Sequence, residues 1–513
     1  MDSANHETSF GRRGTSLSPV SDTKAPATKE TAETFVVGSK TVIDTWISSK
    51  VISGSVRIVE FLIIAVLGFL IYYGYVLERD KIFQWGYVFT IGITTTAVII
   101  SFEAVGMYSI AALRNYIAST SRLISVWTIV IGTFTALVFI SKFADVFSRV
   151  WLASWYLSTV VVLAVERGIL AGFIRKWNEQ GRLQRNAVII GGGQAGEDLI
   201  QALEASSTSD IRISGVFDDR SDDRSPGIIA GIPKLGTVSE LVEFARKVRV
   251  DLLIVTFPVS AESRLLEVLK KLWVLPVDIR LSAHTNKLRF RPRAYSYIGN
   301  VPFLDVFDKP LADWSYILKR LEDQIISAIA LVFALPIMAV VAIAIKLDSR
   351  GPVIFKQNRY GFNNELIEVY KFRSMYTDQS DAKADKLVTK DDPRVTRVGR
   401  FIRKTSLDEL PQLFNSLKGD LSLVGPRPHA VSAKAADKLY GDVVDGYFAR
   451  HRVRPGITGW AQINGWRGET DTAEKIQRRV EHDLYYIENW SILFDLYILA
   501  MTPISLLNTK SAY

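Results

Sequence analysis

Two adjacent acids, Asp408 and Glu409, lie between a Thr-Ser pair and a proline in TSLDELPQ (405–412). Ser406 and Glu409 have the spacing of a capping box, which predicts a helix start. Pro411 would cost a hydrogen bond in a helix begun at Ser406, but it fits the first turn of a helix begun at Asp408. Either start places both carboxylates at a helix N-terminus, where the dipole favours negative charge. We therefore expect Asp408 to stay ionised near neutral pH and to be able to act as a nucleophile.

The two acids are expected to have different tasks, because adjacent helix positions do not share a face. Asp408 is the candidate nucleophile and Glu409 the candidate metal ligand. A diphosphate brought to a carboxylate needs its charge neutralised, which Mg²⁺ and arginines would do. The sequence thus predicts Mg²⁺ as a cofactor, carried by Glu409.

Basic side chains near glycine and proline turns accompany the acids. Rigid turns suit two-pronged contacts between arginine and phosphate. Nucleic acid could use the same groups. Interleaved acids and apolar flanking segments instead favour a small phosphorylated substrate at a bilayer surface, so no nucleic-acid partner is expected. The candidate phosphate- and substrate-binding residues are Lys371, Arg373, Arg400, Arg403, Arg427, Arg454, Gln462 and Arg467.

The composition indicates a membrane protein. The 513-residue chain has a net charge of +9 and a mean hydropathy of +0.15. On a membrane protein such an excess of basic residues marks cytoplasmic loops and contact with anionic lipid. The chain has no cysteine, which excludes disulfides, thiolate nucleophiles and cysteine-ligated metal sites. Its five scattered histidines form no His-Glu-x-x-His pair, which argues against a zinc hydrolase.

Four apolar runs are each about long enough to cross a bilayer core of ~30 Å. They occupy 58–76, 87–107, 123–140 and 150–171. Basic residues precede the first run, separate the second from the third and follow the fourth, so both ends are expected in the cytoplasm. We assign 1–40 to a disordered cytoplasmic tail, because it is polar and almost free of aliphatic residues, and 41–175 to a four-helix transmembrane region.

A fifth apolar run, at 325–345, has 21 uncharged residues and basic residues on both flanks. Pro336 lies near its middle and removes a helix hydrogen bond. Two legs of about ten residues, at ~1.5 Å each, reach only about halfway through the bilayer core. We therefore expect a re-entrant, Pro-broken helix over 317–346 that returns to the cytoplasmic face. The alternative is a kinked span, which would carry everything after 346 to the outside.

Residues 182–300 alternate strand-like and helix-like segments, which predicts a parallel, Rossmann-like sheet. The glycines of GGGQAG (191–196) follow a strand, and Asp218 and Asp219 lie where a ribose-binding acid would be. No tyrosine in the chain has a lysine four residues later, so the Tyr-x-x-x-Lys pair of NAD-dependent nucleotide-sugar enzymes is missing. A scaffold or ligand sensor is one interpretation, and a membrane-anchored NAD-dependent epimerase or dehydratase is the other.

Several motifs together resemble the bacterial sugar transferase family, the monotopic polyprenyl-phosphate sugar-1-phosphate transferases. The resemblance covers about 310–513, and the four spans with a Rossmann-like domain resemble the long members that initiate exopolysaccharide synthesis. NGWRGETDT (464–472) and YYIENWS (485–491) resemble the undecaprenyl-phosphate glucose phosphotransferases. The motifs that carry the family resemblance are the apolar run with Pro336, KFRSM (371–375), SLDELPQLFNSLKGDLSLVGPRP (406–428) and RPGITGWAQINGWRG (454–468).

The resemblance implies transfer of a sugar 1-phosphate, glucose first and galactose next, from a UDP-sugar to undecaprenyl phosphate. Asp408 would attack the β-phosphate, release UMP and hold the sugar-phosphate covalently. Glu409 would carry Mg²⁺, Arg403 and Arg427 would hold phosphates, and uridine contacts would fall around 454–467. It also implies the bacterial cytoplasmic membrane, with the catalytic domain on its cytoplasmic face.

The expected fold class is a membrane protein with α and α/β parts. Four transmembrane helices precede a Rossmann-like domain, and a catalytic domain over 310–513 carries the re-entrant helix and interfacial helices, one of them in 484–507. Membrane lipids are expected partners, and the oligomeric state, a homodimer included, stays open. A non-catalytic scaffold for polysaccharide export is the remaining alternative to an enzyme.

Overall fold

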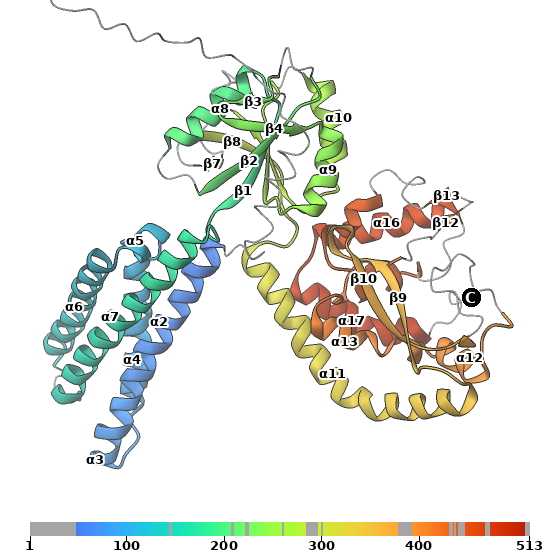
Figure 1. Cartoon of the computed structure of the whole chain (residues 1–513). Coiled ribbons are helices and arrows are strands. Elements are labelled where there is room, and N and C mark those ends of the chain that lie inside the picture. Colours follow the sequence, from blue (N-terminus) through green and yellow to red (C-terminus); the bar gives the residue numbers. More distant parts are fainter. Residues whose placement is uncertain are drawn as a thin grey trace, which may run out of the picture. The chain divides into compact units, whose positions relative to one another are not determined.

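The computed structural model describes residues 48–507, apart from 143–145, 207–209, 221–224, 259–260, 284–295, 299–300, 378–391, 430–433, 436–437, 440–446 and 467–471. The tail predicted over 1–40 lies outside the described residues. Figure 1 shows a helical bundle, a sheet domain and a C-terminal domain with the long curved helix α11.

Four long helices form the bundle, and each contains most of one predicted span. The first continues without a break through a π-helical turn, η1, into α3. The elements are α2 (Ser49–Ile71), η1 (Tyr72–Leu77), α3 (Glu78–Asp80), α4 (Trp85–Ala104), α5 (Ile110–Arg114), α6 (Tyr116–Ile140) and α7 (Arg149–Glu179). The indole N–H of Trp155 donates to the carbonyl oxygen of Ile64 (2.9 Å), which fastens α7 to α2. A buried ion pair between Arg167 and Glu60 (2.6 Å) joins the same two helices.

Helix α11 (Asp313–Asp348) is one continuous helix of 36 residues with Pro336 inside it. The break predicted at Pro336 is therefore wrong. The helix curves instead (Figure 1), as expected where a proline removes one backbone hydrogen bond but its neighbours keep theirs. By length and composition, five helices are long and apolar enough to cross a membrane: the four of the bundle and α11. Four such helices had been predicted.

The sheet domain has helices on both faces of an eight-stranded sheet. The strand order is β3-β4-β2-β1-β5-β6-β8-β7, with a parallel centre from β4 to β6 and antiparallel strands at both edges. Successive residues of β1 alternate between the faces: Val188 packs with α9 and α10, whereas Ile189 packs with α8. The elements are β1 (Arg185–Ile190), α8 (Gln194–Ala205), β2 (Ile211–Phe217), β3 (Ile228–Ile229), β4 (Ile232–Gly236), α9 (Val238–Lys247), β5 (Leu252–Val255), α10 (Glu262–Leu272), β6 (Asp278–Ser282), β7 (Ser296–Ile298) and β8 (Val301–Phe307).

The C-terminal domain packs short strands and helices along α11. A hairpin of β9 and β10 and a parallel pair of β11 and β14 form its small sheets. Its elements after α11 are β9 (Ile354–Tyr360), η3 (Phe362–Asn364), β10 (Leu366–Phe372), α12 (Arg397–Lys404), η5 (Leu407–Glu409), α13 (Gln412–Lys418), β11 (Ser422–Val424), β12 (Lys434–Ala435), β13 (Lys438–Leu439), η6 (Tyr447–Arg452), β14 (Gly456–Thr458), α15 (Trp460–Ile463), α16 (Ala473–Glu488) and α17 (Ile492–Leu507).

One stripe of α11 is buried against this domain on both sides of Pro336. Its buried positions recur every three or four residues, which places them on one face of the helix. They are Lys319, Asp323, Ser327, Leu331, Ala334, Met338, Val341 and Ile345. At the far end, the carboxylate of Asp348 accepts from the backbone N–H of Val398 (3.0 Å) in α12. The opposite face exposes large apolar side chains, including Val332, Phe333 and Val340.

Candidate active site

The acid pair lies on a single 3-10 turn, η5, between α12 and α13. Neither predicted helix start is correct. Ser406 adopts a left-handed conformation (φ 60°) and its side chain makes no capping hydrogen bond, so the capping box is not formed. The α-helix begins at Gln412, after Pro411. The reason is local: Pro411 supplies no N–H, so the chain turns through η5 first and enters the helix only behind the proline.

Two cations from distant strands meet at Glu409. Lys371, near the end of β10, places its Nζ 2.8 Å from Oε1. Arg427, three residues beyond β11, places Nη2 2.5 Å from Oε1 and Nη1 3.4 Å from Oε2. Burial raises the pKa of Glu409, but Arg427 and Lys371 outweigh burial and hold that pKa well below its usual value. Glu409 is therefore ionised, and its charge is matched by two cations.

Asp408 has a different electrostatic setting. Burial raises its pKa, and the Glu409 carboxylate adds to that effect. The positive charges of Lys371, Arg403 and Arg427 oppose it. In the structure, the pKa of Asp408 depends on burial, which raises it, and on three cations, which lower it, rather than on the helix dipole expected from the sequence. The two acids have distinct environments, as predicted, and the pKa of the one is raised while that of the other is lowered.

Arg359 and Arg450 also belong to the site. The sequence indicates Arg450 only as one of several anion-binding arginines in RHRVRPG (450–456), and it does not indicate Arg359 as a site residue. The Nη1 of Arg359, in β9, donates to the carbonyl oxygen of Pro428 (2.5 Å). The Nη2 of Arg450, in η6, donates to the carbonyl oxygen of Arg427 (2.9 Å). Burial and the nearby charge of Arg427 lower the pKa of Arg359 to about 10. Both lie far from the acids along the chain, so their contacts beside Arg427 depend on the tertiary structure.

Two other predicted residues, Arg373 and Arg454, lie at different places in the domain. Arg373 is buried and donates to the carbonyl oxygens of Ser349 (2.7 Å) and Arg350 (2.5 Å) at the end of α11. Arg454 donates to the Tyr316 hydroxyl (2.9 Å) and lies over its ring. These arginines are bonded to α11 and its following turn, not to the acid pair.

Arg400 and Gln462 lie on two short helices, α12 and α15. Arg400 is exposed on α12, next to Phe401, which is 62% exposed. Gln462 is buried on α15, and its Oε1 has no hydrogen-bond partner among the described residues. Arg467 lies outside the described residues. The structure thus gathers Lys371, Arg403 and Arg427 around the acids, whereas Arg373 and Arg454 bond α11 and the turn that follows it.

The carboxylates fit Mg²⁺ only together with a phosphorylated substrate. Within the described ranges, no group of three or more histidines and acids could hold a metal ion by itself. Mg²⁺ is commonly bound by one or two carboxylates and completed by substrate phosphates and water. Asp408 and Glu409 match that donor set, although Oε1 of Glu409 must then share its charge with Lys371 and Arg427.

The glycine loop of the sheet domain is hydrogen-bonded to Asp218. Asp218 Oδ2 accepts the backbone N–H of Gly192 (2.7 Å), and Oδ1 accepts that of Arg220 (3.1 Å). Asp219 Oδ1 accepts the backbone N–H of Val238 (2.8 Å) at the start of α9. The two acids predicted to reach a ribose are thus bonded to the protein. As it stands, the loop does not offer Gly192 N–H to the phosphate of a nucleotide coenzyme.

Comparison with known families gives two matches. Residues 314–509 match the family described as bacterial sugar transferase. Residues 103–283 match a family described as CoA-binding domain, and this match covers the later helices of the bundle and most of the sheet. The first match contains α11, both acids and every residue gathered around them.

Characterised relatives extend the similarity over most of the chain. The undecaprenyl-phosphate glucose phosphotransferase of Komagataeibacter xylinus is 41% identical over 68% of this chain and 64% of its own length. The UDP-glucose:undecaprenyl-phosphate glucose-1-phosphate transferase of Escherichia coli (strain K12) is 37% identical over 75% of this chain and 81% of its own length. An Aeromonas hydrophila protein named as a UDP-N-acetylgalactosamine-undecaprenyl-phosphate N-acetylgalactosaminephosphotransferase is 43% identical, over 36% of this chain and 42% of its own.

Proposed function

This chain belongs to the bacterial sugar transferase family, and from that membership we propose that it transfers glucose 1-phosphate from UDP-glucose to undecaprenyl phosphate, releasing UMP. The observation that carries the proposal is the partly buried Asp408 among the charges of Lys371, Arg403 and Arg427. A carboxylate surrounded by cations can receive a diphosphate and attack it, because the cations attract the substrate's charge and the carboxylate is the nucleophile.

The reaction proceeds in two displacements at phosphorus. An oxygen of Asp408 attacks the β-phosphorus of UDP-glucose, and the bond from that phosphorus to the bridging oxygen breaks, so UMP leaves with the electron pair. The glucose phosphate is then bonded to Asp408 as an acyl phosphate. A phosphate oxygen of undecaprenyl phosphate attacks the same phosphorus, which frees Asp408 and gives undecaprenyl-diphospho-glucose.

The surrounding residues support each displacement. Arg403 and Arg427 hold phosphate oxygens, because guanidinium groups bind phosphate in two-pronged fashion. Lys371 balances the charge of Glu409, so that a diphosphate does not meet two bare carboxylates. When bound, Mg²⁺ would supply further neutralisation of the diphosphate, and Glu409 is the residue that would hold it.

We place the acid pair on the cytoplasmic face, with α11 dipping into the membrane rather than crossing it. A straight 36-residue helix is about 54 Å long, well beyond a ~30 Å core. Lys319, near its start, pairs with Asp495, and Asp348, at its end, bonds α12. One polar domain cannot contact both ends of a helix that crosses a bilayer. Both ends of α11 therefore belong on the cytoplasmic side, where UDP-glucose would reach the acid pair.

The lipid acceptor approaches along the exposed apolar surfaces of the domain. Leu493, Leu496 and Tyr497 of α17 and Phe401 of α12 are exposed, and apolar surface of this kind marks membrane contact. Arg400 and Arg397 lie on α12 near Phe401, where cations meet anionic headgroups. The acid pair, which directly follows α12, then lies at the height of the lipid phosphate.

Glucose is proposed on the names of the long relatives. The Aeromonas protein, named for N-acetylgalactosamine, is comparably identical over a shorter region, so similarity in that region does not fix the sugar. The deciding experiment measures UMP released by membranes containing the full chain, with and without undecaprenyl phosphate, across UDP-glucose, UDP-galactose and UDP-N-acetylgalactosamine. We expect UMP to be released faster from UDP-glucose than from the other two UDP-sugars. Absence of UMP from all three would refute the proposed function.

A further inference from the structure

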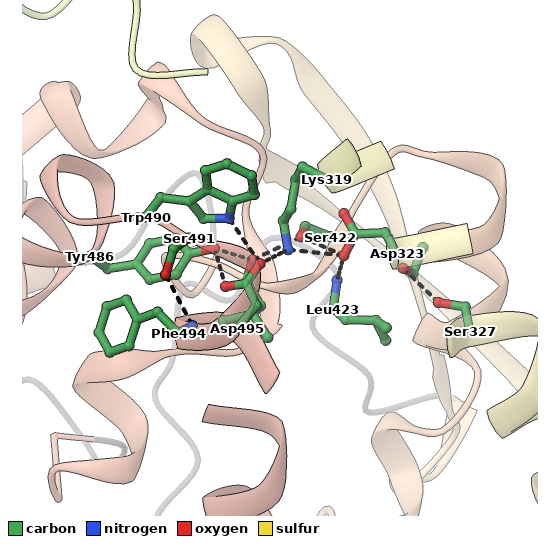
Figure 2. A network of polar contacts seen from close by, with 12 residues as sticks. Lys319, Asp323, Ser327, Ser422, Leu423, Tyr486, Trp490, Ser491, Phe494 and Asp495 are labelled. Carbon is green, nitrogen blue, oxygen red and sulfur yellow. Dashed lines mark hydrogen bonds and ion pairs between the residues drawn. The ribbon is translucent and has the colours of Figure 1, made fainter. Parts of the chain in front are cut away.

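Asp323 of α11 accepts hydrogen bonds from β11, the strand that leads to Arg427. Its Oδ1 accepts the backbone N–H of Leu423 (2.9 Å) and lies 2.9 Å from the hydroxyl of Ser422, both in β11 (Figure 2). Asp323 is 2% exposed. These are buried hydrogen bonds to a carboxylate, which are stronger than those between neutral groups. The Asp323 carboxylate therefore hydrogen-bonds α11 to β11.

A buried set of charges holds Asp323 in place. Nζ of Lys319 lies 3.0 Å from Oδ1 of Asp323 and 2.6 Å from Oδ2 of Asp495, so one cation joins α11 to α17 (Figure 2). The Tyr486 hydroxyl lies 2.8 Å from Oδ1 of Asp495, and the Trp490 indole N–H donates to its Oδ2 (2.9 Å). Two carboxylates thus share one lysine, and neutral donors also bond Oδ1 of Asp323 and both oxygen atoms of Asp495.

Tyr486 also reaches the other end of β11. Its hydroxyl lies 3.0 Å from the carbonyl oxygen of Val424, so the strand is held between α11 and α16. A buried ion pair adds little net stability compared with apolar side chains of the same volume. Its effect is to fix geometry, since each member accepts only a narrow range of positions for its partners.

The chain from β11 to Arg427 and Pro428 is hydrogen-bonded at every residue. Gly425 must lack a side chain, because a Cβ there would lie 2.6 Å from the carbonyl oxygen of Arg454. A displacement at Leu423 is therefore passed on to Arg427 rather than absorbed on the way. The bonds are Gly425 N–H to Thr458 oxygen (2.9 Å), Gly456 N–H to Pro426 oxygen (2.9 Å), Arg450 to Arg427 oxygen (2.9 Å) and Arg359 to Pro428 oxygen (2.5 Å).

We propose that Asp323 is a positioning residue that sets the placement of Arg427 through β11, so that docking of α11 prepares the phosphate site beside Glu409. This inference rests on the proposed function, in which Arg427 holds a phosphate of the substrate. The physical reason is distance: phosphate stabilisation by a guanidinium falls steeply when the donor moves by about 1 Å. Asp323 touches no reacting atom and acts only through the strand.

Two substitutions at one position separate this role from a purely structural one. Asp323→Ala removes the acceptor for Leu423, whereas Asp323→Asn keeps an oxygen there; both remove the negative charge that faces Lys319. We expect kcat/KM for UMP release to fall about 10- to 100-fold in Asp323→Ala and by no more than about threefold in Asp323→Asn. Equal losses in the two variants would show that only the ion pair matters and would overturn the proposal.

A double-mutant cycle tests whether the effect passes through Arg427. If Asp323 acts through that guanidinium, then Asp323→Ala in an Arg427→Lys background should cost no more than about twofold further. Losses that multiply would overturn the proposal. The matched control is Ser327→Ala, one turn along the same buried face, whose hydroxyl bonds Ser416 (2.8 Å) and not β11. Its kcat/KM is expected to equal that of the wild type.

Tyr486→Phe is the second route if Asp323→Ala does not fold. It removes the hydroxyl that holds the Val424 carbonyl and leaves the ring in place. The proposal is supported if Tyr486→Phe lowers kcat/KM several fold and if this loss does not multiply with the loss caused by Arg427→Lys. An unchanged kcat/KM in Tyr486→Phe overturns it. Failure of the proposed function is distinguishable, because the wild type itself would then release no UMP from any UDP-sugar.

Discussion

Arg427 and Glu409 form a two-armed ion pair, with Nη2 2.5 Å from Oε1 and Nη1 3.4 Å from Oε2. The pair joins two segments that are 18 residues apart and makes the Gly-Pro-Arg-Pro turn one wall of the acid site. Glu409 is thereby oriented by the protein before any substrate arrives. Asp408, by contrast, forms no ion pair with a side chain among the described residues, and its environment is set by burial and by the nearby charges.

Asp408→Asn is expected to abolish UMP release, by at least about 10³-fold, because an amide cannot form the acyl phosphate. UMP produced from UDP-glucose by purified protein is the measurement. The matched control is Asp420→Asn, which removes a partly exposed carboxylate paired with Lys418 and should leave the rate unchanged. Normal turnover in Asp408→Asn would rule out the covalent route.

Arg403→Met should move the acidic limb of the pH–rate profile to higher pH. Protonated Asp408 is no nucleophile, so kcat/KM falls as pH drops through its pKa. The positive charge of Arg403 lowers that pKa, so its removal lets burial raise the pKa further. Lys404→Met, an exposed cation on the same helix, is the control. A limb that stays in place would show that Arg403 does not act on Asp408.

Lys371→Met and Glu409→Gln should change the Mg²⁺ requirement in opposite directions. Removing Lys371 takes one competing cation from Oε1 of Glu409, so the half-saturating Mg²⁺ concentration should fall about threefold or more. Glu409→Gln removes the anionic ligand, so the same concentration should rise about tenfold. The measurement is UMP release titrated with Mg²⁺. Unchanged half-saturation in both variants would exclude Glu409 as the metal ligand.

A single cysteine tests the path of α11. The chain has no cysteine, so Asn358→Cys, on an exposed position of β9, supplies the only thiol. A membrane-impermeant maleimide should label it in inverted vesicles and not in intact cells. Lys81→Cys, in the predicted outer loop, should show the reverse and serves as the control. Labelling of Asn358→Cys from outside would mean that α11 spans the membrane.

Arg373→Met should destabilise the catalytic domain without being an active-site change. The buried guanidinium bonds the carbonyl oxygens of Ser349 and Arg350 that follow α11, and its loss leaves them without these donors. Such a loss costs about 3 kcal/mol, several degrees in Tm. Thermal unfolding in detergent is the measurement, with exposed Lys346→Met as control. An unchanged Tm together with lost substrate binding would restore the phosphate role predicted for Arg373.

Local sequence patterns were sufficient to predict much of the fold. The lengths of the apolar runs predicted the four helices of the bundle. A membrane span needs a fixed number of residues, and a helix satisfies its backbone hydrogen bonds within its own segment. Strand and helix alternation predicted the sheet domain, although its antiparallel edges were not foreseen. At Pro336 local reasoning failed: the lost hydrogen bond bends α11 but does not end it, since packing of the buried stripe holds the helix together across the proline.

The residues that carry charge and chemistry are evident from the sequence: the adjacent acids, the arginines, and the apolar helix that precedes them. Which cations meet the acids depends on the folded arrangement of the domain. Lys371 and Arg427 reach Glu409, whereas Arg373 and Arg454 bond elsewhere. Arg359 and Arg450 bond the backbone beside Arg427 from segments far away along the chain. The physical reason is that an ion pair depends on positions in space, and side chains 18 to 38 residues apart are brought together by strand pairing and helix packing that no local pattern records.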